Sequence, residues 1–179
     1  YNRMYLFEYN YIFHVSLMHR RELALRAGGY HEDVRVMIEW DLNRKLSFYA
    51  DFLHVPVVTG EFFVTTKDSD RISDLQRRDM EKFEQNMRRI RADLPPEPWP
   101  KVRKVGVVFP VQRWDEEEMR AIQYFFDVLK YPCRVILVNM DGGTDDEKVR
   151  EHLGQLVELR NLSWVNVGPG LYPHEARLE

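Results

Sequence analysis

The chain has 179 residues, of which 44% are hydrophobic and 31% are charged, and its formal net charge at pH 7 is −3. This length suits one ordinary domain or two small ones, and the weak negative charge gives no basic field that would attract nucleic acid. The single cysteine, Cys133, excludes an internal disulfide and a cysteine-rich metal cluster. No apolar run reaches the roughly 18 to 20 residues of a transmembrane helix, so we expect a cytoplasmic protein that meets a membrane only through a larger parent polypeptide.

The first 94 residues combine short elements with one long helix. The opening segment alternates with a period of two, which favours a strand; its aromatic residues are Tyr1, Tyr5, Phe7, Tyr9, Tyr11 and Phe13. The other expected elements, in chain order, are a strand over 11–19, helices over 20–27 and 36–49, extended segments over 52–58 and 61–65, and a helix over 72–94. In that last helix apolar residues step by three and four positions, which gives it a face suited to a second copy in a homo-oligomer.

A proline-rich run divides the sequence. It reads Pro-Pro-Glu-Pro-Trp-Pro from residue 95 and cannot be helical. We therefore predict a domain over 1–94, a stiff extended linker over 95–103 and a second domain over 104–179. Because the chain opens on Tyr1 inside an aromatic stretch, we also expect it to be a fragment of a longer protein.

The second domain alternates strands and helices. Apolar runs without alternation predict buried strands over 105–111, 133–138 and 163–167. Asp115 with Glu118, and Thr144 with Glu147, have the spacing of capping boxes that would begin the two intervening helices. This order predicts an α/β fold with a parallel sheet covered by helices on both faces.

Three groups of residues in the first domain follow one another in a distinctive order. They are Arg20-Arg21-Glu22, then Gly28-Gly29-Tyr30-His31-Glu32, then Glu39-Trp40-Asp41-Leu42. This order resembles the acceptor-side half of family 2 glycosyltransferases of the GT-A fold. In that family a strand, Arg-Arg-Glu, a helix, Gly-Gly-Phe-Asp-Glu and Glu-Asp-Trp-Asp-Leu occur in succession. The resemblance covers about residues 10 to 70.

The resemblance implies roles for five residues. An inverting sugar transfer needs a carboxylate that takes the proton of the acceptor hydroxyl, and a helix N-terminus keeps such a carboxylate ionised. Glu39 matches the aspartate base of the family and Asp41 matches the next acidic residue, so both are assigned to catalysis. Arg20, Arg21 and Trp40 are assigned to substrate binding.

This chain departs from the family pattern at two adjacent positions. Ile38 replaces the first acidic residue, and Glu39 replaces the aspartate and reaches about one methylene further. Simpler interpretations remain open: an ordinary acidic first turn for Glu39 and Asp41, and a solvated helix start for Arg20 and Arg21.

The second domain resembles the first nucleotide-binding turn of the same superfamily. A strand that ends in Val135-Ile136-Leu137-Val138 is followed by Asn-Met-Asp-Gly-Gly-Thr-Asp, where the family has a carboxylate that contacts the nucleotide base. By this resemblance Asp141 is the candidate for the nucleotide contact. A strand-turn-helix without a ligand is the alternative.

The metal site of the family has no counterpart in a suitable place. Asp68-Ser69-Asp70 has the letters of the Asp-X-Asp motif, but it follows the acceptor half and precedes a helix. It is therefore interpreted as a helix N-cap, and no metal ligand is assigned in this chain. A complete enzyme of this kind would use Mg²⁺ or Mn²⁺ to neutralise the sugar diphosphate.

The sequence thus predicts an α/β, GT-A/Rossmann-like parallel-type sheet with covering helices, in fragmentary form. The function that the resemblance implies is transfer of a sugar from a nucleotide sugar to a glycan or lipid-linked acceptor. The alternative is a non-catalytic GT-A-like binding or scaffolding module.

Overall fold

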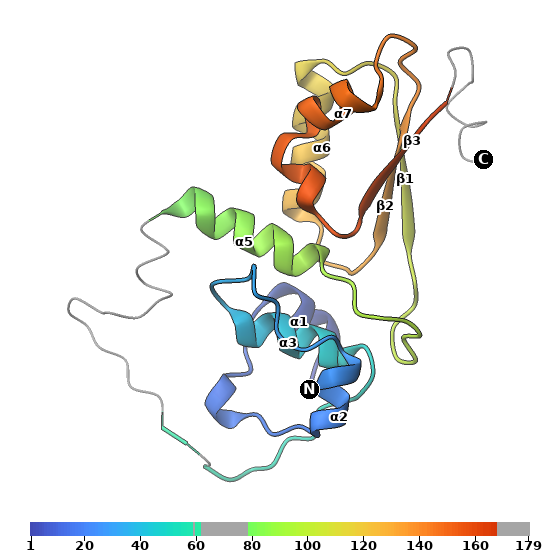
Figure 1. The fold of residues 1–179 in the computed structure, drawn as a ribbon. Helices are drawn as coiled ribbons and strands as arrows, with labels where there is room; N and C mark the ends of the chain where they lie inside the picture. The colour runs from blue at the N-terminus through green and yellow to red at the C-terminus, as the bar shows by residue number, and fades with distance from the viewer. Residues whose placement is uncertain (59, 62–78, 168–179) are drawn as a thin grey trace. The chain divides into compact units, whose positions relative to one another are not determined.

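A computed structural model describes residues 1–58, 60–61 and 79–167 of the chain. The chain divides into two compact units, Tyr1–Arg103 and Lys104–Glu179, and Figure 1 shows the elements of each. Among the described helices, none combines the length and the apolar character that crossing a membrane requires.

The described part of the first unit is helical (Figure 1). Its elements are α1 (Arg3–Glu8), a 3₁₀ turn (His14–Ser16), α2 (Arg21–Arg26), α3 (Ile38–Ser47) and α5 (Met80–Ala92). The core forms where Leu6, Val34 and Ile90 pack against the fully buried ring of Trp40. The helices expected over 20–27 and 36–49 are confirmed, each slightly shorter than predicted. Of the helix expected over 72–94, residues 72–78 lie outside the described residues, and α5 begins at Met80 and ends at Ala92, two residues earlier than predicted.

The two strands predicted before residue 20 are wrong. The side chain of Asn2 accepts a hydrogen bond from the amide of Tyr5 and begins α1, which buries Leu6 and Phe7. Residues 11–19 form loops and the 3₁₀ turn. A strand needs a neighbour that satisfies its backbone groups, and the described part of this unit contains no strand. For the same reason residues 52–58 form no hydrogen-bonded strand. Of the extended segment expected over 61–65, only Glu61 lies within the described residues.

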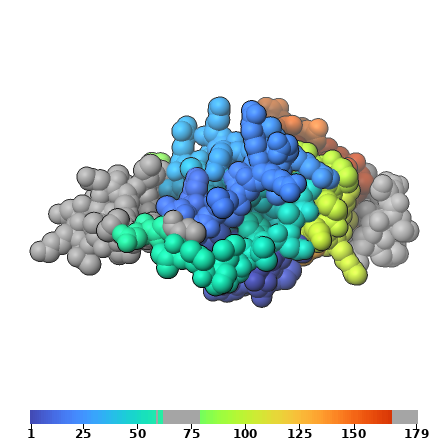
Figure 2. Space-filling model, turned by 90° about the horizontal axis from the view of Figure 1, so that it is seen from below, coloured from blue at the N-terminus to red at the C-terminus, as the bar shows by residue number. Residues whose placement is uncertain are grey.

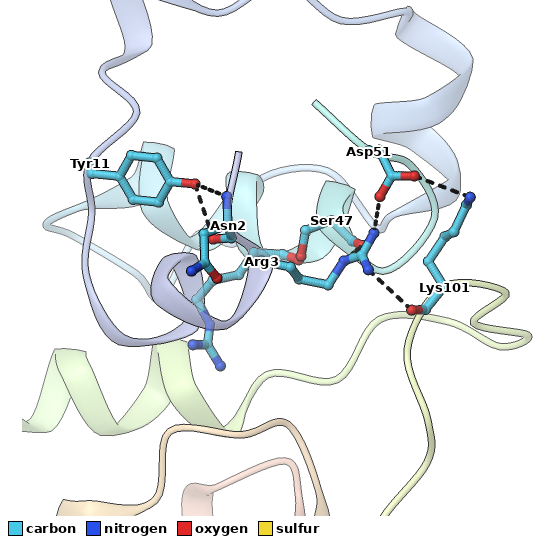
Figure 3. A network of polar contacts seen from close by, with 7 residues as sticks. Asn2, Arg3, Tyr11, Ser47, Asp51 and Lys101 are labelled. Carbon is cyan, nitrogen blue, oxygen red and sulfur yellow. Dashed lines mark hydrogen bonds and ion pairs between the residues drawn. The ribbon is translucent and has the colours of Figure 1, made fainter. Parts of the chain in front are cut away.

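The segment 95–103, expected as a linker, packs on the first unit. Trp99 is buried and its ring lies 5.0 Å from that of Phe48, while the amide of Lys101 donates to the Phe48 carbonyl at 3.1 Å. Figure 3 shows Arg3 of α1 between the Ser47 carbonyl, the Asp51 carboxylate and the Lys101 carbonyl. This single guanidinium therefore ties α1, the end of α3 and the proline-rich segment together.

The second unit is a three-stranded parallel sheet with two helices. Its elements are β1 (Gly106–Val111), α6 (Glu116–Val128), β2 (Arg134–Asn139), α7 (Asp146–Leu153), a 3₁₀ turn (Gly154–Glu158) and β3 (Leu162–Asn166). The strand order is β1-β2-β3, with Val108 opposite Ile136 and Ile136 opposite Ser163. The predicted α/β class with a parallel sheet is confirmed.

The described helices α6 and α7 lie on one face of this sheet (Figure 1), whereas cover on both faces was predicted. The reason is topological. Two successive right-handed crossovers that run in the same direction place both helices on the same side. Val108 and Val165 on the opposite face are correspondingly exposed.

The helix caps follow the prediction at one of two places. Asp115 accepts a hydrogen bond from the Glu118 amide and begins α6 as expected. At α7 the cap is Asp145, which accepts from the Lys148 amide, and the predicted cap Thr144 is wrong by one residue. The hydroxyl of Thr144 instead donates to Asp141 at 3.0 Å, so it belongs to the preceding turn.

Asn139, at the end of β2, joins the loops at the carboxyl edge of the sheet. Its buried Oδ1 accepts from Trp114 Nε1 at 2.8 Å and from the Asp141 amide at 3.1 Å. Its Nδ2 donates to the Thr144 carbonyl and to Asn166 Oδ1, both at 2.8 Å. One side chain thus fixes the ends of all three strands.

We predict that Asn139→Ala lowers the free energy of unfolding of the second unit by about 3 kcal/mol, because buried partners lose their hydrogen bonds. Urea unfolding of the chain checks this value. Gln123→Ala, at an exposed position of α6, is the control and should change nothing measurable. An Asn139→Ala variant as stable as the wild-type protein would contradict the joining role of this side chain.

Candidate functional site

Glu39 lies half-buried in the first turn of α3. The helix begins after Met37, whose φ of 54° is left-handed and unusual for a residue other than glycine. Backbone strain of this kind occurs where the surrounding structure holds a particular geometry. Here it sets the direction from which the chain enters α3 and therefore where the Glu39 side chain begins.

Three side chains from other segments accompany Glu39, and with it they form what we call the Glu39 cluster. Asn10 Nδ2 donates to Glu39 Oε1 at 2.8 Å. The Tyr30 ring stacks on His14 with centroids 6.2 Å apart, and the Tyr30 hydroxyl lies 3.5 Å from His14 Nε2. Burial first, and then the negative charge of Glu39, raise the pKa of the Tyr30 hydroxyl. The loop after α1, the 3₁₀ turn and the double-glycine loop thus meet at the start of α3.

This arrangement suits a proton acceptor. One carboxylate oxygen of Glu39 is held by a neutral amide, and the helix N-terminus favours the negative charge. His14 and Tyr30 are exposed beside it and offer ring faces and polar atoms to a ligand.

Asp41 points away from solvent and forms a buried ionic network. Lys45 Nζ lies 2.7 Å from Asp41 Oδ2 and 3.4 Å from Asp93 Oδ2, and both the Asp41 and Lys45 side chains are only 1% exposed. Lys45 also donates to the Gly29 carbonyl at 2.6 Å, and His31 Nε2 lies 3.0 Å from Asp93 Oδ2. Since Asp41 is buried away from solvent, its catalytic assignment is replaced by a structural one: it pairs with Lys45, and Lys45 joins α3 to the double-glycine loop.

His31, Asp41 and Asp93 together could offer three ligand atoms within 4.8 Å of one another. They do not fit the Mg²⁺ or Mn²⁺ that a sugar diphosphate requires. Both carboxylates are buried, and the ammonium of Lys45 already provides a positive charge between them. A diphosphate would need access to such an ion.

Trp40 and Arg44 belong to the core. The Trp40 indole is 0% exposed and donates to the Leu6 carbonyl at 2.6 Å, so its assignment to substrate binding is replaced by packing. Arg44 donates to the Phe7 carbonyl and, at 3.3 Å, to that of Arg91. Burial first, and then the charge of Arg91, lower the pKa of Arg44 to about 10, and the group still remains charged at neutral pH.

Arg20 and Arg21 stand at the start of α2 with exposed side chains. Within the described residues no contact joins either of them to Glu39. Figure 2 shows the face on which the blue N-terminal residues and the teal residues near 50–58 lie side by side. The two segments approach each other closely, because a Cβ atom placed on Gly60 would lie 3.3 Å from the Val15 carbonyl oxygen. Because Arg20 and Arg21 are exposed and do not contact Glu39, they remain available to a ligand but are not part of the Glu39 cluster.

Asp141 closes a tight turn after β2. Its Oδ1 accepts from the Gly143 amide at 3.1 Å and its Oδ2 accepts from the Thr144 hydroxyl at 3.0 Å. The Gly143 amide first, and then the Thr144 hydroxyl, lower the pKa of Asp141. Both oxygens already have partners, so a nucleotide contact would have to share them with the turn.

Comparisons with protein-family models, with curated proteins and with solved structures found no match. The functional argument therefore depends on the residues themselves. Sequence reasoning named Glu39 but missed Asn10 and His14, which no motif marks. Tyr30 and His31 directly follow Gly28-Gly29, and two polar side chains next to a double glycine are the signal that could have identified them.

We predict that Lys45→Met destabilises the first unit by about 3–5 kcal/mol at pH 7, because it leaves two buried carboxylates without the ammonium. Burial already raises the pKa of Asp41. A carboxyl group with a raised pKa contributes stability at low pH and loses that contribution as the pH rises. The defect should therefore shrink between pH 7 and about pH 4 as Asp41 protonates.

Urea unfolding at both pH values measures this difference. Lys82→Met, which removes an exposed lysine paired with Asp79, should leave the midpoint unchanged. A Lys45→Met defect of equal size at both pH values would contradict the ionic explanation.

We predict that Asp141→Ala costs the second unit about 1 kcal/mol at pH 7, because the turn loses two acceptors. The folded pKa of Asp141 lies below its ordinary value of 3.8, so its contribution is present above about pH 4 and disappears as the pH falls through the folded pKa. Hydrogen exchange of the α7 amides at pH 6, compared between the variant and the wild-type protein, measures the change. Equal exchange in the two proteins at pH 6 would contradict this account.

Proposed function

We propose that this chain carries the acceptor-side half of an inverting, family 2-type glycosyltransferase. In this proposal both units are related to the GT-A fold. The observation that carries the proposal is the Glu39 carboxylate in the first turn of α3, half-buried and bonded through one oxygen to Asn10. The succession of Arg-Arg-Glu, Gly-Gly and Glu-Trp-Asp-Leu in the sequence supports the same family. The acceptor is a glycan or a lipid-linked sugar.

In the proposed reaction Glu39 acts as the general base. It takes the proton of the acceptor hydroxyl while the acceptor oxygen bonds to the anomeric carbon. The bond from that carbon to the diphosphate breaks, and the nucleoside diphosphate leaves with the electron pair. In a complete enzyme a divalent cation supplies the charge that neutralises this leaving group. The described residues of this chain hold no site that fits it.

The second unit is proposed to be a nucleotide-binding-like half. Three parallel strands end at one edge, which is where open parallel sheets bind ligands. Asp141 and Thr144 lie there in the turn after β2, next to the loop that carries Trp114. The donor nucleotide would contact this edge.

A non-catalytic GT-A-like binding or scaffolding module is the second candidate. The burial of Trp40 and Asp41 favours it, because two of the motif residues serve the core rather than a substrate. Ile38, which is 39% exposed beside Glu39, favours it as well, because an apolar side chain stands where the family has an acid. The two candidates differ in whether Glu39 moves a proton.

We predict that Glu39→Gln lowers sugar transfer by about 100- to 10,000-fold, the usual contribution of a general base. The assay offers UDP- and GDP-sugars with glycan acceptors to a complete enzyme that contains this chain, and thermal shift with UDP, GDP and Mn²⁺ measures nucleotide binding in parallel. Glu22→Gln makes the same change on the exposed surface of α2 and is the matched control. Nucleotide binding without transfer would support the scaffolding module, and an unchanged rate in Glu39→Gln would remove Glu39 as the base.

A further inference from the structure

The Glu39 side chain is held from outside its own helix. Asn10 follows α1 in the chain and is separated from Glu39 by 29 positions, yet its Nδ2 donates to Glu39 Oε1 at 2.8 Å. We propose that Asn10 is the positioning residue of the catalytic carboxylate: it holds Oε1 and thereby leaves Oε2 to receive the proton of the acceptor. This inference rests on the proposed function.

Asn10 is itself held on both sides. Before it, α1 is fixed to α3 because Trp40 Nε1 donates to the Leu6 carbonyl at 2.6 Å. After it, Asn43 Nδ2 donates to the Ile12 carbonyl at 2.9 Å. Glu39 and Asn43 stand four positions apart on α3, so one face of this helix bonds to the same loop twice. The amide of Asn10 therefore reaches Glu39 from an anchored segment.

The extra methylene of Glu39 explains why such a residue is needed. A glutamate has one more rotatable bond than an aspartate, and each unrestrained bond gives the carboxylate further orientations. Proton transfer requires the accepting oxygen to lie within hydrogen-bond distance of the acceptor hydroxyl. A hydrogen bond to Oε1 removes this freedom. Asn10 thus compensates for the longer side chain at the position of the base.

Each bond that breaks in this reaction is matched by a bond that forms or by a group that leaves. The O–H bond of the acceptor breaks and its proton moves to Oε2, while Oε1 stays on the Asn10 amide. The acceptor oxygen forms the new bond to the anomeric carbon, and the nucleoside diphosphate carries away the electron pair of the bond that breaks. Asn10 neither gains nor loses a proton, so it acts only through Glu39.

The test is a double-mutant cycle on the transfer reaction of a complete enzyme that contains this chain. We expect Asn10→Ala to lower kcat by about tenfold, the value of one hydrogen bond, with the KM for the acceptor unchanged. In a Glu39→Asp background the shorter carboxylate no longer reaches the amide, so Asn10→Ala should cause no further loss. Urea unfolding of each variant verifies that the first unit remains folded.

The outcomes separate the two proposals. An equal loss from Asn10→Ala in both backgrounds, or a rise in KM in place of the fall in kcat, would overturn the positioning role and leave Glu39 as the base. An unchanged rate in Glu39→Gln, or no transfer by a complete enzyme that contains the wild-type chain, would overturn the proposed function and with it the role of Asn10.

Discussion

The buried ammonium of Lys45 is the interaction on which the geometry of the first unit depends. It lies between Asp41 of its own helix and Asp93 just after α5, and it donates to the Gly29 carbonyl. Removal of any member would leave charge in an apolar setting, where an unpaired ion is far more costly than at the surface. The double-glycine loop, α3 and the end of α5 all meet at this ion. These contacts fix α3 within the first unit, and they thereby fix the place from which the Glu39 side chain extends.

The motif that resembles the glycosyltransferases therefore serves two purposes. Trp40 and Asp41 face inward and assemble the core, while Glu39 faces the loop that carries Asn10. Neighbouring residues on a helix point about 100° apart, so one short stretch of sequence supplies both the core contacts and a half-buried carboxylate. A resemblance in letters identifies the stretch but does not distinguish these purposes, which only burial and hydrogen bonds separate.

The fold was more predictable from sequence than the site. The strands of the second unit and the helix α3 followed from apolar runs and helical periodicity, because both patterns report local burial directly. The opening segment was misread, since alternating aromatic residues fit a strand while the cap by Asn2 favours a helix. Asn10 carried no signal at all: its importance arises from a contact across 29 positions. The cap shift from Thr144 to Asp145 shows how a competing hydrogen bond can move a boundary by one residue.

The four hydrogen bonds of Asn139 have a mechanical consequence for the carboxyl edge of the sheet. They couple the Trp114 loop, the Asp141 turn and the end of β3 at Asn166 through one buried amide. Loops that are hydrogen-bonded to the same buried side chain cannot change conformation independently when a ligand binds. A ligand at this rim would meet a preformed shape and would lose little entropy to loop ordering, so selectivity there would follow from fit rather than from closure.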